Sequence, residues 1–262
     1  MNRIVVKVGG HALDRLDAGS PVLEDLANDV KSIRETSSTI IVHGGGPQIA
    51  TLLERVGLAS EFRDGLRVTT PETMEYVAMA LGLVNLRITA ALSHAGLAAV
   101  GLSGVDGALV RATAHGGLLG RVASDIGVDD GLVTSLLERG WTPVVGPVAS
   151  DDVGELLNCN ADTVAGAIAA SLDADVLVLL SDVDQLRGDP DDPASALASV
   201  SSAEVRSMMA AGSIRDGMIP KMRAALDAID AGAARVVLAN GTRPHALRGV
   251  LDGTSPSTEV MR

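Results

Sequence analysis

Short runs of apolar, often β-branched residues recur along the chain. They do not alternate strictly between apolar and polar positions, which is typical of strands buried on both faces of a parallel sheet. The runs cover residues 3–8, 39–42, 97–103, 142–148, 175–181 and 234–239. We therefore expect these segments to form the strands of a largely parallel sheet.

Helical patterns lie between the runs. Ile49, Leu52, Leu53 and Val56 follow the i, i+3, i+4, i+7 spacing of one helix face. Several other helical segments end in a glycine directly before a strand, as expected for a helix C-cap in a tight connection. Alternating helices and strands predict a doubly wound α/β fold.

Three segments depart from this alternation. Residues 61–70 and 107–114 have the pattern of hairpin or edge strands, so the sheet could be mixed rather than all parallel. Residues 187–196 are polar and contain two prolines, which indicates an exposed loop.

The composition narrows the class of protein. The 262 residues are 47% hydrophobic, with only one Phe, one Tyr and one Trp, so aromatic platforms for nucleic-acid bases are lacking. The net charge of −12 also disfavours nucleic acid or an anionic membrane as partner. A single cysteine, Cys159, fits a reducing compartment. We see no apolar run of 18 residues and no signal peptide, so we expect a cytoplasmic protein outside the membrane.

Two glycine-rich loops follow strand runs. Gly9 and Gly10 follow residues 3–8, and Gly44, Gly45 and Gly46 follow residues 39–42. Such turns can present backbone N–H groups to an anion at the start of the next helix. Two tight turns without a ligand are the alternative. The chain has no P-loop sequence, no GxGxxG, and no GxSxG elbow that an esterase oxyanion loop would require.

Polar residues that could carry chemistry gather in four further places. Asn158, Asn160 and Asp162 alternate before an apolar helix and could share one side, although Asn160 or Asp162 could simply cap that helix. Ser181 and Asp182 end the most apolar strand run, at the usual ligand edge of an α/β sheet or in a mere polar turn.

Two basic residues stand out in the same way. Lys221 follows Gly217 early in a helix, where its charge opposes the helix dipole unless a phosphate lies nearby. Arg67 precedes a helix that we expect to begin near Pro71, and it could pair with a carboxylate. Both could equally be solvated surface residues. Lysine is scarce, since only Lys7, Lys31 and Lys221 occur beside 18 arginines among the 21 basic residues.

Taken together, the segments resemble the amino acid kinase family, in family order and over nearly the whole chain. The segments that carry the resemblance are KVGG, VHGGGPQI, DGLRVTTPETMEYV, LGLVNLRI, AVGLSGVDG, LNCNADTVAGAIA, LLSDVDQL and DGMIPKMRAALDAIDAG. The resemblance implies a three-layer αβα sandwich. It also implies an N-terminal lobe, residues 1–173, for an acyl substrate and dimerisation, and a C-terminal lobe, residues 174–262, for ATP.

The resemblance is strongest to members that phosphorylate the γ-carboxylate of N-acetyl-L-glutamate with ATP in arginine biosynthesis. It implies that Lys7 and Lys221 are catalytic and that Asp162 organises them. The substrate-binding residues that it implies are Gly45, Gly46, Arg67, Asn158 and Asn160. The phosphate- and ATP-binding residues that it implies are Gly9, Gly10, Gly44, Ser181, Asp182, Ile214, Gly217 and Met218. Mg²⁺ should arrive with ATP on the phosphates, without a protein metal site.

Some features leave alternatives open. Gln185 stands where relatives usually have glycine, which could alter the nucleotide loop. The chain starts at its first strand, without the extra helix of arginine-inhibited hexameric members, so we expect a homodimer. Rival interpretations are a kinase for a carrier-linked aminoadipate or glutamate, a carbamate or aspartate kinase, and a non-catalytic nucleotide or amino-acid sensor of the same fold.

Overall fold

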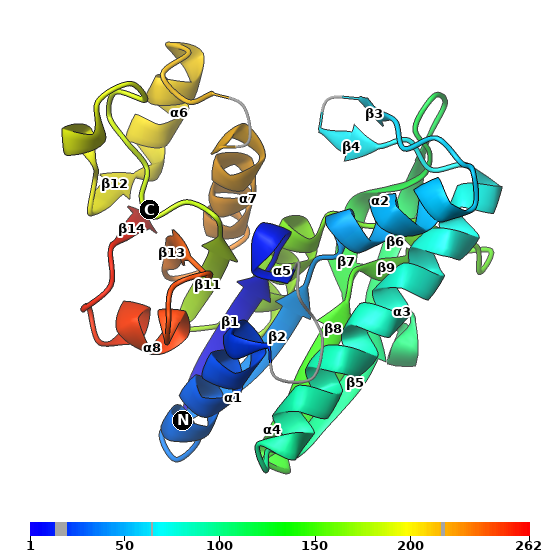
Figure 1. Ribbon diagram of the computed structural model, residues 1–262, viewed down its shortest axis with the longest axis horizontal. Coiled ribbons are helices and arrows are strands. Elements are labelled where there is room, and N and C mark those ends of the chain that lie inside the picture. Colours follow the sequence, from blue (N-terminus) through cyan, green and yellow to red (C-terminus); the bar gives the residue numbers. More distant parts are fainter. Residues whose placement is uncertain (14–19, 64, 216–217) are drawn as a thin grey trace.

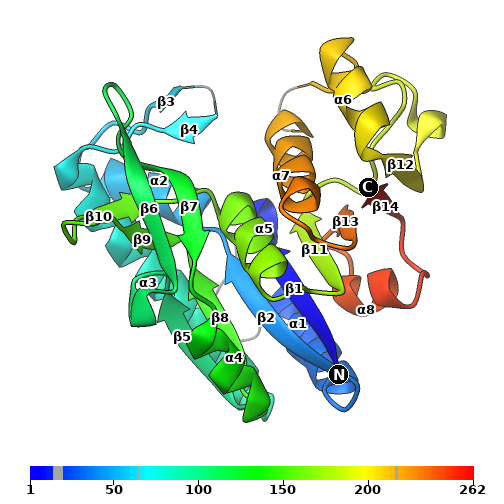
Figure 2. The same ribbon diagram turned by 180° about the vertical axis from the view of Figure 1, so that it is seen from behind.

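The computed structural model describes residues 1–13, 20–63, 65–215 and 218–262. Its centre is an eight-stranded sheet with helices on both faces, so the expected αβα sandwich is confirmed (Figures 1 and 2). In spatial order the strands are β12 (Ser199–Ser201), β14 (Ser257–Met261), β13 (Val236–Asn240), β11 (Val176–Ser181), β1 (Asn2–Val8), β2 (Ser37–His43), β8 (Thr142–Gly146) and β5 (Ala99–Ser103).

The sheet is mixed at one edge only. The six strands from β13 to β5 run parallel to one another, whereas β14 pairs antiparallel with β13 and parallel with β12. All six expected core strands are present. The apolar run 142–148 is split, because the chain leaves β8 at Gly146 and enters another sheet at Val148.

Two hydrophobic clusters occupy the two faces of the sheet. Val5 faces one cluster, and its neighbours Ile4 and Val6 face the other, so both faces of β1 are buried and no polar alternation is needed. The helices on the Val5 face are α4 (Gly131–Glu138), α5 (Ala161–Ser171), α6 (Ser202–Ala210) and α7 (Met218–Asp230). The helices on the opposite face are α1 (Pro21–Ile33), α3 (Pro71–His94) and α8 (Ala246–Leu251).

Smaller elements complete the fold. A four-stranded barrel, which the sequence did not predict as such, consists of β10 (Leu156–Asn158), β7 (Gly120–Val128), β6 (Val110–Gly116) and β9 (Val148–Ser150). The hairpin expected in residues 61–70 is β3 (Phe62–Arg63) with β4 (Leu66–Arg67). Helix α2 (Gly46–Arg55) packs on α3. The short 3₁₀ helices are η1 (Gly10–Leu13), η2 (Asp106–Ala108) and η3 (Pro193–Ser195).

Helix α3 has the length and hydropathy of a membrane span, which the sequence analysis did not anticipate. It is the one such helix in the described parts of the chain. Strands β5 and β8 and helices α1 and α2 pack against it, and its buried side chains, such as Val84 and Ile88, belong to the core. A single helix of this kind, integrated into a core, is weak grounds for a membrane protein.

A polar contact joins α1 to α8. His245 Nδ1 lies 2.8 Å from Oδ1 of the buried Asp29, and the other oxygen of Asp29 accepts from the Arg248 N–H. The hydrogen bond with Asp29, and the charges of Asp25 and Asp29, raise the pKa of His245 above its ordinary value. The contact therefore stabilises the fold fully below about pH 6.5, the unfolded pKa, and loses its effect as the pH rises through the folded pKa.

We expect His245→Asn to lower the melting temperature more at pH 5.5 than at pH 8.5. Asparagine tolerates the left-handed backbone of this position (φ 49°), so the variant removes the titration without adding strain. Thermal unfolding of wild type and variant at both pH values checks this. An equal decrease in melting temperature at the two pH values would contradict a raised pKa of His245 as the cause of the stabilisation.

Candidate functional site

A buried lysine and an aspartate meet at the carboxyl end of the central strands. Lys7 lies near the end of β1, is 7% exposed, and places its Nζ 2.9 Å from Oδ1 of Asp162 in the first turn of α5. Gly9 makes room for this side chain, because a Cβ there would lie 2.2 Å from the Lys7 Nζ. The Asp162 carboxylate thus holds the ammonium group in place, and the missing side chain at Gly9 leaves the room that it occupies.

The two glycine loops lie against one another. The Gly44 N–H donates to Val8 O at 2.8 Å, the Gly9 N–H donates to Leu180 O at 3.3 Å, and a Cβ on Gly44 would lie 3.5 Å from the Gly9 Cα. Gly10 follows directly as the first residue of η1. The parallel register of β11, β1 and β2 brings these loops together. Their backbone therefore forms one surface beside Lys7.

A first cleft, of about 260 Å³, opens in front of this surface. It brings together most of the residues that the resemblance assigns to catalysis and substrate binding. They are Lys7, Gly45, Gly46, Arg67, Asn158, Asn160 and Asp162, with Gly44 from the phosphate-binding set.

Arg67 enters the first cleft from β4 and is 7% exposed, so it is no surface arginine. Its guanidinium donates to Gly46 O at 3.0 Å and to the Ser60 hydroxyl, and it lies 4.6 Å from the centroid of the Phe62 ring. Burial lowers the pKa of Arg67 from its ordinary value, but an arginine remains charged at neutral pH. The cleft therefore holds a second fixed cation.

The two asparagines have different local roles. Asn160 is the N-cap of α5, since its Oδ1 accepts from the N–H groups of Asp162 (2.8 Å) and Thr163 (3.1 Å), which leaves its NH₂ group for the cleft. Asn158 ends β10, and its Nδ2 donates to Thr69 Oγ1 at 3.1 Å. The capping alternative is thus correct for Asn160, whose amide still lines the cleft.

Lys221 and Asp182 form a second pair on the other side of α5. The Lys221 Nζ lies 3.5 Å from Asp182 Oδ1, with the side chains 19% and 42% exposed. Asp182 follows β11, the strand beside β1, and α7, which carries Lys221, packs on α5. A Cβ on Gly166 of α5 would lie 3.1 Å from the Ala228 Cβ of α7, so the two helices are in close contact.

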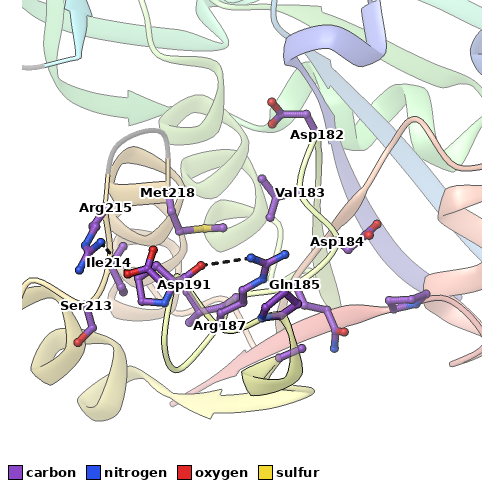
Figure 3. A pocket seen from close by; sticks show the side chains of 15 residues that line it. Asp182, Val183, Asp184, Gln185, Arg187, Asp191, Ser213, Ile214, Arg215 and Met218 are labelled. Carbon is purple, nitrogen blue, oxygen red and sulfur yellow. Dashed lines mark hydrogen bonds and ion pairs between the residues drawn. The ribbon is translucent and has the colours of Figure 1, made fainter.

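A second cleft, of about 760 Å³, begins at Asp182. Ile214, Arg215 and Met218 form one wall, and Val183 and Gln185 lie on the opposite one (Figure 3). The cleft combines apolar side chains, which suit a planar base, with two arginines and three aspartates. Arg215 lies 3.3 Å from one of these aspartates, Asp191.

Ser181 is not among the described residues that line the two clefts, whereas Gln185 lines the second cleft. Ser181 is buried beneath the second cleft, where its hydroxyl accepts from the Val183 N–H at 3.3 Å. Gly217 lies outside the described residues. Gln185, the departure from relatives, donates from Nε2 to Ser257 O at 3.0 Å and so ties the loop after β11 to the start of β14.

Sequence reasoning missed several residues at the two clefts. Ser60 and Phe62 hold Arg67, and Thr69 holds Asn158. Arg187 and Arg215 line the second cleft. The one phenylalanine in a chain almost free of aromatic residues, five positions before Arg67, was the available signal for the first group.

Neither a metal cluster nor a reactive thiol accompanies the clefts in the described parts of the chain. No group of three or more His, Cys, Asp or Glu side chains suitable for a metal ion occurs among those residues. Cys159 lines the first cleft, but burial raises its pKa to about 12, so it is a neutral thiol at physiological pH.

The chain is similar to known proteins in sequence and in structure. The sequence model of the amino acid kinase family matches residues 2–240. A Deinococcus radiodurans protein named acetylglutamate kinase is 46% identical over 238 residues, covering 91% of this chain and 92% of its own. One of the same name from Symbiobacterium thermophilum is 42% identical, covering 93% and 86%. The crystal structure of smu.665 from Streptococcus mutans superimposes with a TM-score of 0.80 at 29% identity, covering 91% and 94%.

Proposed function

Because the chain belongs to the amino acid kinase family, we propose that it transfers the γ-phosphoryl group of ATP to the γ-carboxylate of N-acetyl-L-glutamate. The products are N-acetyl-L-glutamyl 5-phosphate and ADP, in the second step of arginine biosynthesis. The activity is that of an acetylglutamate kinase (EC 2.7.2.8). The observation that carries the proposal is the pairing of buried Lys7 with Asp162 in one cleft with Arg67 and three consecutive glycines.

The chemistry needs positioning and charge neutralisation more than proton transfer. The attacking carboxylate is already ionised at neutral pH, so no general base is required. Both reactants are anions, and their approach is opposed unless cations lie between them. Lys7 lines the cleft of the acyl substrate and stabilises charge on the nucleophile side. Lys221, at the Asp182 end of the second cleft, stabilises charge on the leaving side.

The glycine loops supply the remaining donors. Gly44, Gly45 and Gly46 line the first cleft with backbone alone, and a Cβ on Gly45 would lie 2.7 Å from the Leu81 side chain. The Gly44 N–H is taken up by Val8 O, but the N–H groups of Gly45 and Gly46 can approach the transferring group without interference from side chains. Donors placed in advance where charge develops cost no reorganisation in the transition state. Close packing against Leu81 and against Gly9 accounts for Gly45 and Gly44, and the bare backbone that results is free to contact a transferring phosphoryl group.

ATP occupies the second cleft in this proposal. Ile214 and Met218 offer apolar contact for the base, and Arg187 and Arg215 would have to leave Pro190 O and Asp191 to contact phosphates. Mg²⁺ enters on the phosphates in this proposal, because this small, strongly hydrated ion is bound mainly through phosphate oxygens and water in such sites. When bound, the ion neutralises phosphate charge during transfer.

Two lobes with separate tasks follow from the two clefts. The described residues that line the first cleft all lie within 1–173, and those that line the second all lie within 174–262. We propose the first segment as the lobe for the acyl substrate and the second as the lobe for ATP. Strands β1 and β11 pair across this boundary within one sheet, so the lobes share their core.

Arg67 binds the α-carboxylate of N-acetylglutamate in this account. We expect Arg67→Lys to raise the KM for N-acetylglutamate by about tenfold or more, because a point charge replaces a planar fork that donates two parallel bonds. The KM for ATP should change little. Steady-state kinetics in both substrates checks this, with exposed Arg63→Lys on the same hairpin as the matched control. Equal increases in both KM values would contradict the assignment.

We further propose a cytoplasmic homodimer. Met79, Leu83 and Leu86 are 59%, 51% and 68% exposed, and their spacing places them on one face of α3. An apolar stripe of this kind is suited to a second copy of the chain. Sedimentation of the wild type should give a dimer, and Leu83→Glu should shift it toward monomer. A monomeric wild type would contradict the proposal. So would a hexamer.

A hydroxamate assay tests the function itself, because hydroxylamine traps acyl phosphates directly. We expect trapping with N-acetylglutamate and little with glutamate, aspartate or aminoadipate. Preference for a carrier-linked acid would favour the rival kinase instead. ADP release that is equal with and without N-acetylglutamate would favour a nucleotide-binding sensor.

A further inference from the structure

One polar residue in the middle of α3 has no part in the proposed reaction. Asn85 lies in the LGLVNLRI segment, half-buried, where β2, β5 and β8 come together. Its Nδ2 lies 2.8 Å from Val144 O, 3.1 Å from Leu102 O and 3.1 Å from His43 Nε2. Two of these partners are carbonyl oxygens, which only accept, so the NH₂ end of the amide must face them. The NH₂ group has two hydrogens for three acceptors, so one hydrogen is shared between two of them.

His43 is the last residue of β2 and is fully buried. Its Nδ1 lies 2.8 Å from Gly44 O, and because a carbonyl accepts, Nδ1 carries the ring hydrogen. Nε2 then faces the Asn85 amide as the acceptor. Burial lowers the pKa of His43 to about 4, which agrees with a neutral ring in this arrangement.

Two glycines make room for the Asn85–His43 pair. A Cβ on Gly101 of β5 would lie 2.1 Å from Asn85 Oδ1, and a Cβ on Gly146 of β8 would lie 3.2 Å from His43 Nε2. The two glycines lie on adjacent parallel strands, where Gly101 of β5 is opposite Val144 and Gly146 of β8 is opposite Ser103. The absence of side chains at Gly101 and Gly146 therefore leaves the space that Asn85 and His43 occupy.

The hydrogen-bonded pair of Asn85 and His43 contacts the glycine loop through the bond from His43 to Gly44 O. A trans peptide directs its C=O and N–H to opposite sides, so a Gly44 carbonyl turned toward His43 turns the Gly45 N–H away from it. The Gly45 N–H has no hydrogen-bond acceptor among the described residues, and Gly45 lines the first cleft. The direction of the Gly45 N–H is thus set by His43, which does not line the first cleft.

We propose that Asn85 and His43 are positioning residues: Asn85 selects the Nδ1–H tautomer of His43, and His43 holds the Gly44 carbonyl so that the Gly45 N–H faces the transferring phosphoryl group. This inference rests on the proposed function. Neither residue touches the substrates; both act through the orientation of one peptide group. Misplacement of a donor by about 1 Å can cost up to about 10²-fold in rate.

The kinetic test compares Asn85→Ala with Thr89→Val, one turn further along α3. The Thr89 hydroxyl is buried and has no hydrogen-bond partner within the described parts of the chain, so its replacement removes no bond seen there. We expect Asn85→Ala to lower kcat by about 10-fold to 10²-fold with small changes in both KM values. Thr89→Val should retain the wild-type kcat. Gly146→Ala, which crowds the ring and keeps Asn85, should lower kcat in the same way.

A spectroscopic test is independent of activity. In protein with ¹⁵N-labelled histidine, the wild-type His43 ring should be neutral and protonated on Nδ1 from pH 5.5 to 8.5. In Asn85→Ala, Nε2 loses its donor, so the population of the Nδ1–H tautomer of His43 should fall. A wild-type ring protonated on Nε2 overturns the proposal. So does a wild-type kcat in folded Asn85→Ala, or in Gly146→Ala if Asn85→Ala does not fold. Failure of the wild type to form acyl phosphate would instead overturn the proposed function.

Discussion

Lys7→Ala should lower kcat by about 10²–10³-fold or more, the typical cost of one lost charge or donor at a transferring group. The ammonium group of Lys7 lies in a cleft with Arg67 and the glycine loop, and water cannot replace it as a fixed charge. Its effect belongs to the transition state, in which negative charge is shared between nucleophile and phosphoryl group. The KM values should therefore change much less than kcat.

The control for this variant is Lys31→Ala. Lys31 is exposed and donates to Ala95 O at 3.0 Å, far from the clefts, so its removal should leave kcat unchanged. Lys7→Ala also leaves Asp162 without its partner, and breaking a buried pair typically costs about 3–5 kcal/mol. Thermal unfolding should accompany the kinetics, and Lys7→Met keeps the apolar stem. A folded variant with wild-type kcat would remove Lys7 from the mechanism.

Lys221→Ala should have a comparable effect, again about 10²–10³-fold in kcat. Here the lost charge lies on the leaving side, beside Asp182 and the second cleft. A weak effect on the KM for N-acetylglutamate is expected, because that substrate occupies the other cleft. Steady-state kinetics in both substrates is the measurement.

Arg223→Ala is the matched control for Lys221→Ala. Arg223 lies two positions further along α7 and is exposed, so it removes a nearby positive charge from the same helix without touching the clefts. If both variants lose activity equally, the general charge of α7 matters and not the ammonium of Lys221. If neither does, the leaving side lacks the cation that we assign to it.

The sequence predicted the parallel core well because both faces of its strands are buried. Runs such as residues 3–8 and 175–181 are apolar throughout, and only a sheet with helices on both sides gives such strands a place. The glycines at helix ends were equally informative. Gly96, Gly140 and Gly232 all have positive φ, as a C-cap requires.

The barrel of β6, β7, β9 and β10 was harder to predict. Its strands are short or half-exposed, and β9 continues from β8 after a single residue, so one apolar run contains two strands of different sheets. Pairing between β10 and β9 is decided by tertiary contacts and not by any local pattern. Propensity and periodicity carry no information about such pairings.

The candidate site also contains residues that the sequence could identify and residues that it could not. The glycine loops and Lys7 drew attention because their residue types are costly where they occur, whereas the roles of Lys7 and Asp162 came from the family resemblance. A lysine in an apolar strand and three consecutive glycines both need a reason. Thr69 and Asn85 were not identified, because each acts through a partner distant in sequence. Ser60 and His43 act on nearby residues, Arg67 and Gly44, but no local pattern marks those contacts. Only the fold brings such partners together.

The structure of the protein with ADP, a planar aluminium fluoride and N-acetylglutamate would test the central claim most directly. We predict that the Nζ atoms of Lys7 and Lys221, on opposite sides of the fluoride group, and the Gly45 N–H all lie within hydrogen-bonding distance, about 3 Å, of its ligands or of the oxygens that flank it. A complex in which either ammonium group turns away to solvent, with the fluoride group held by other residues, would contradict the account.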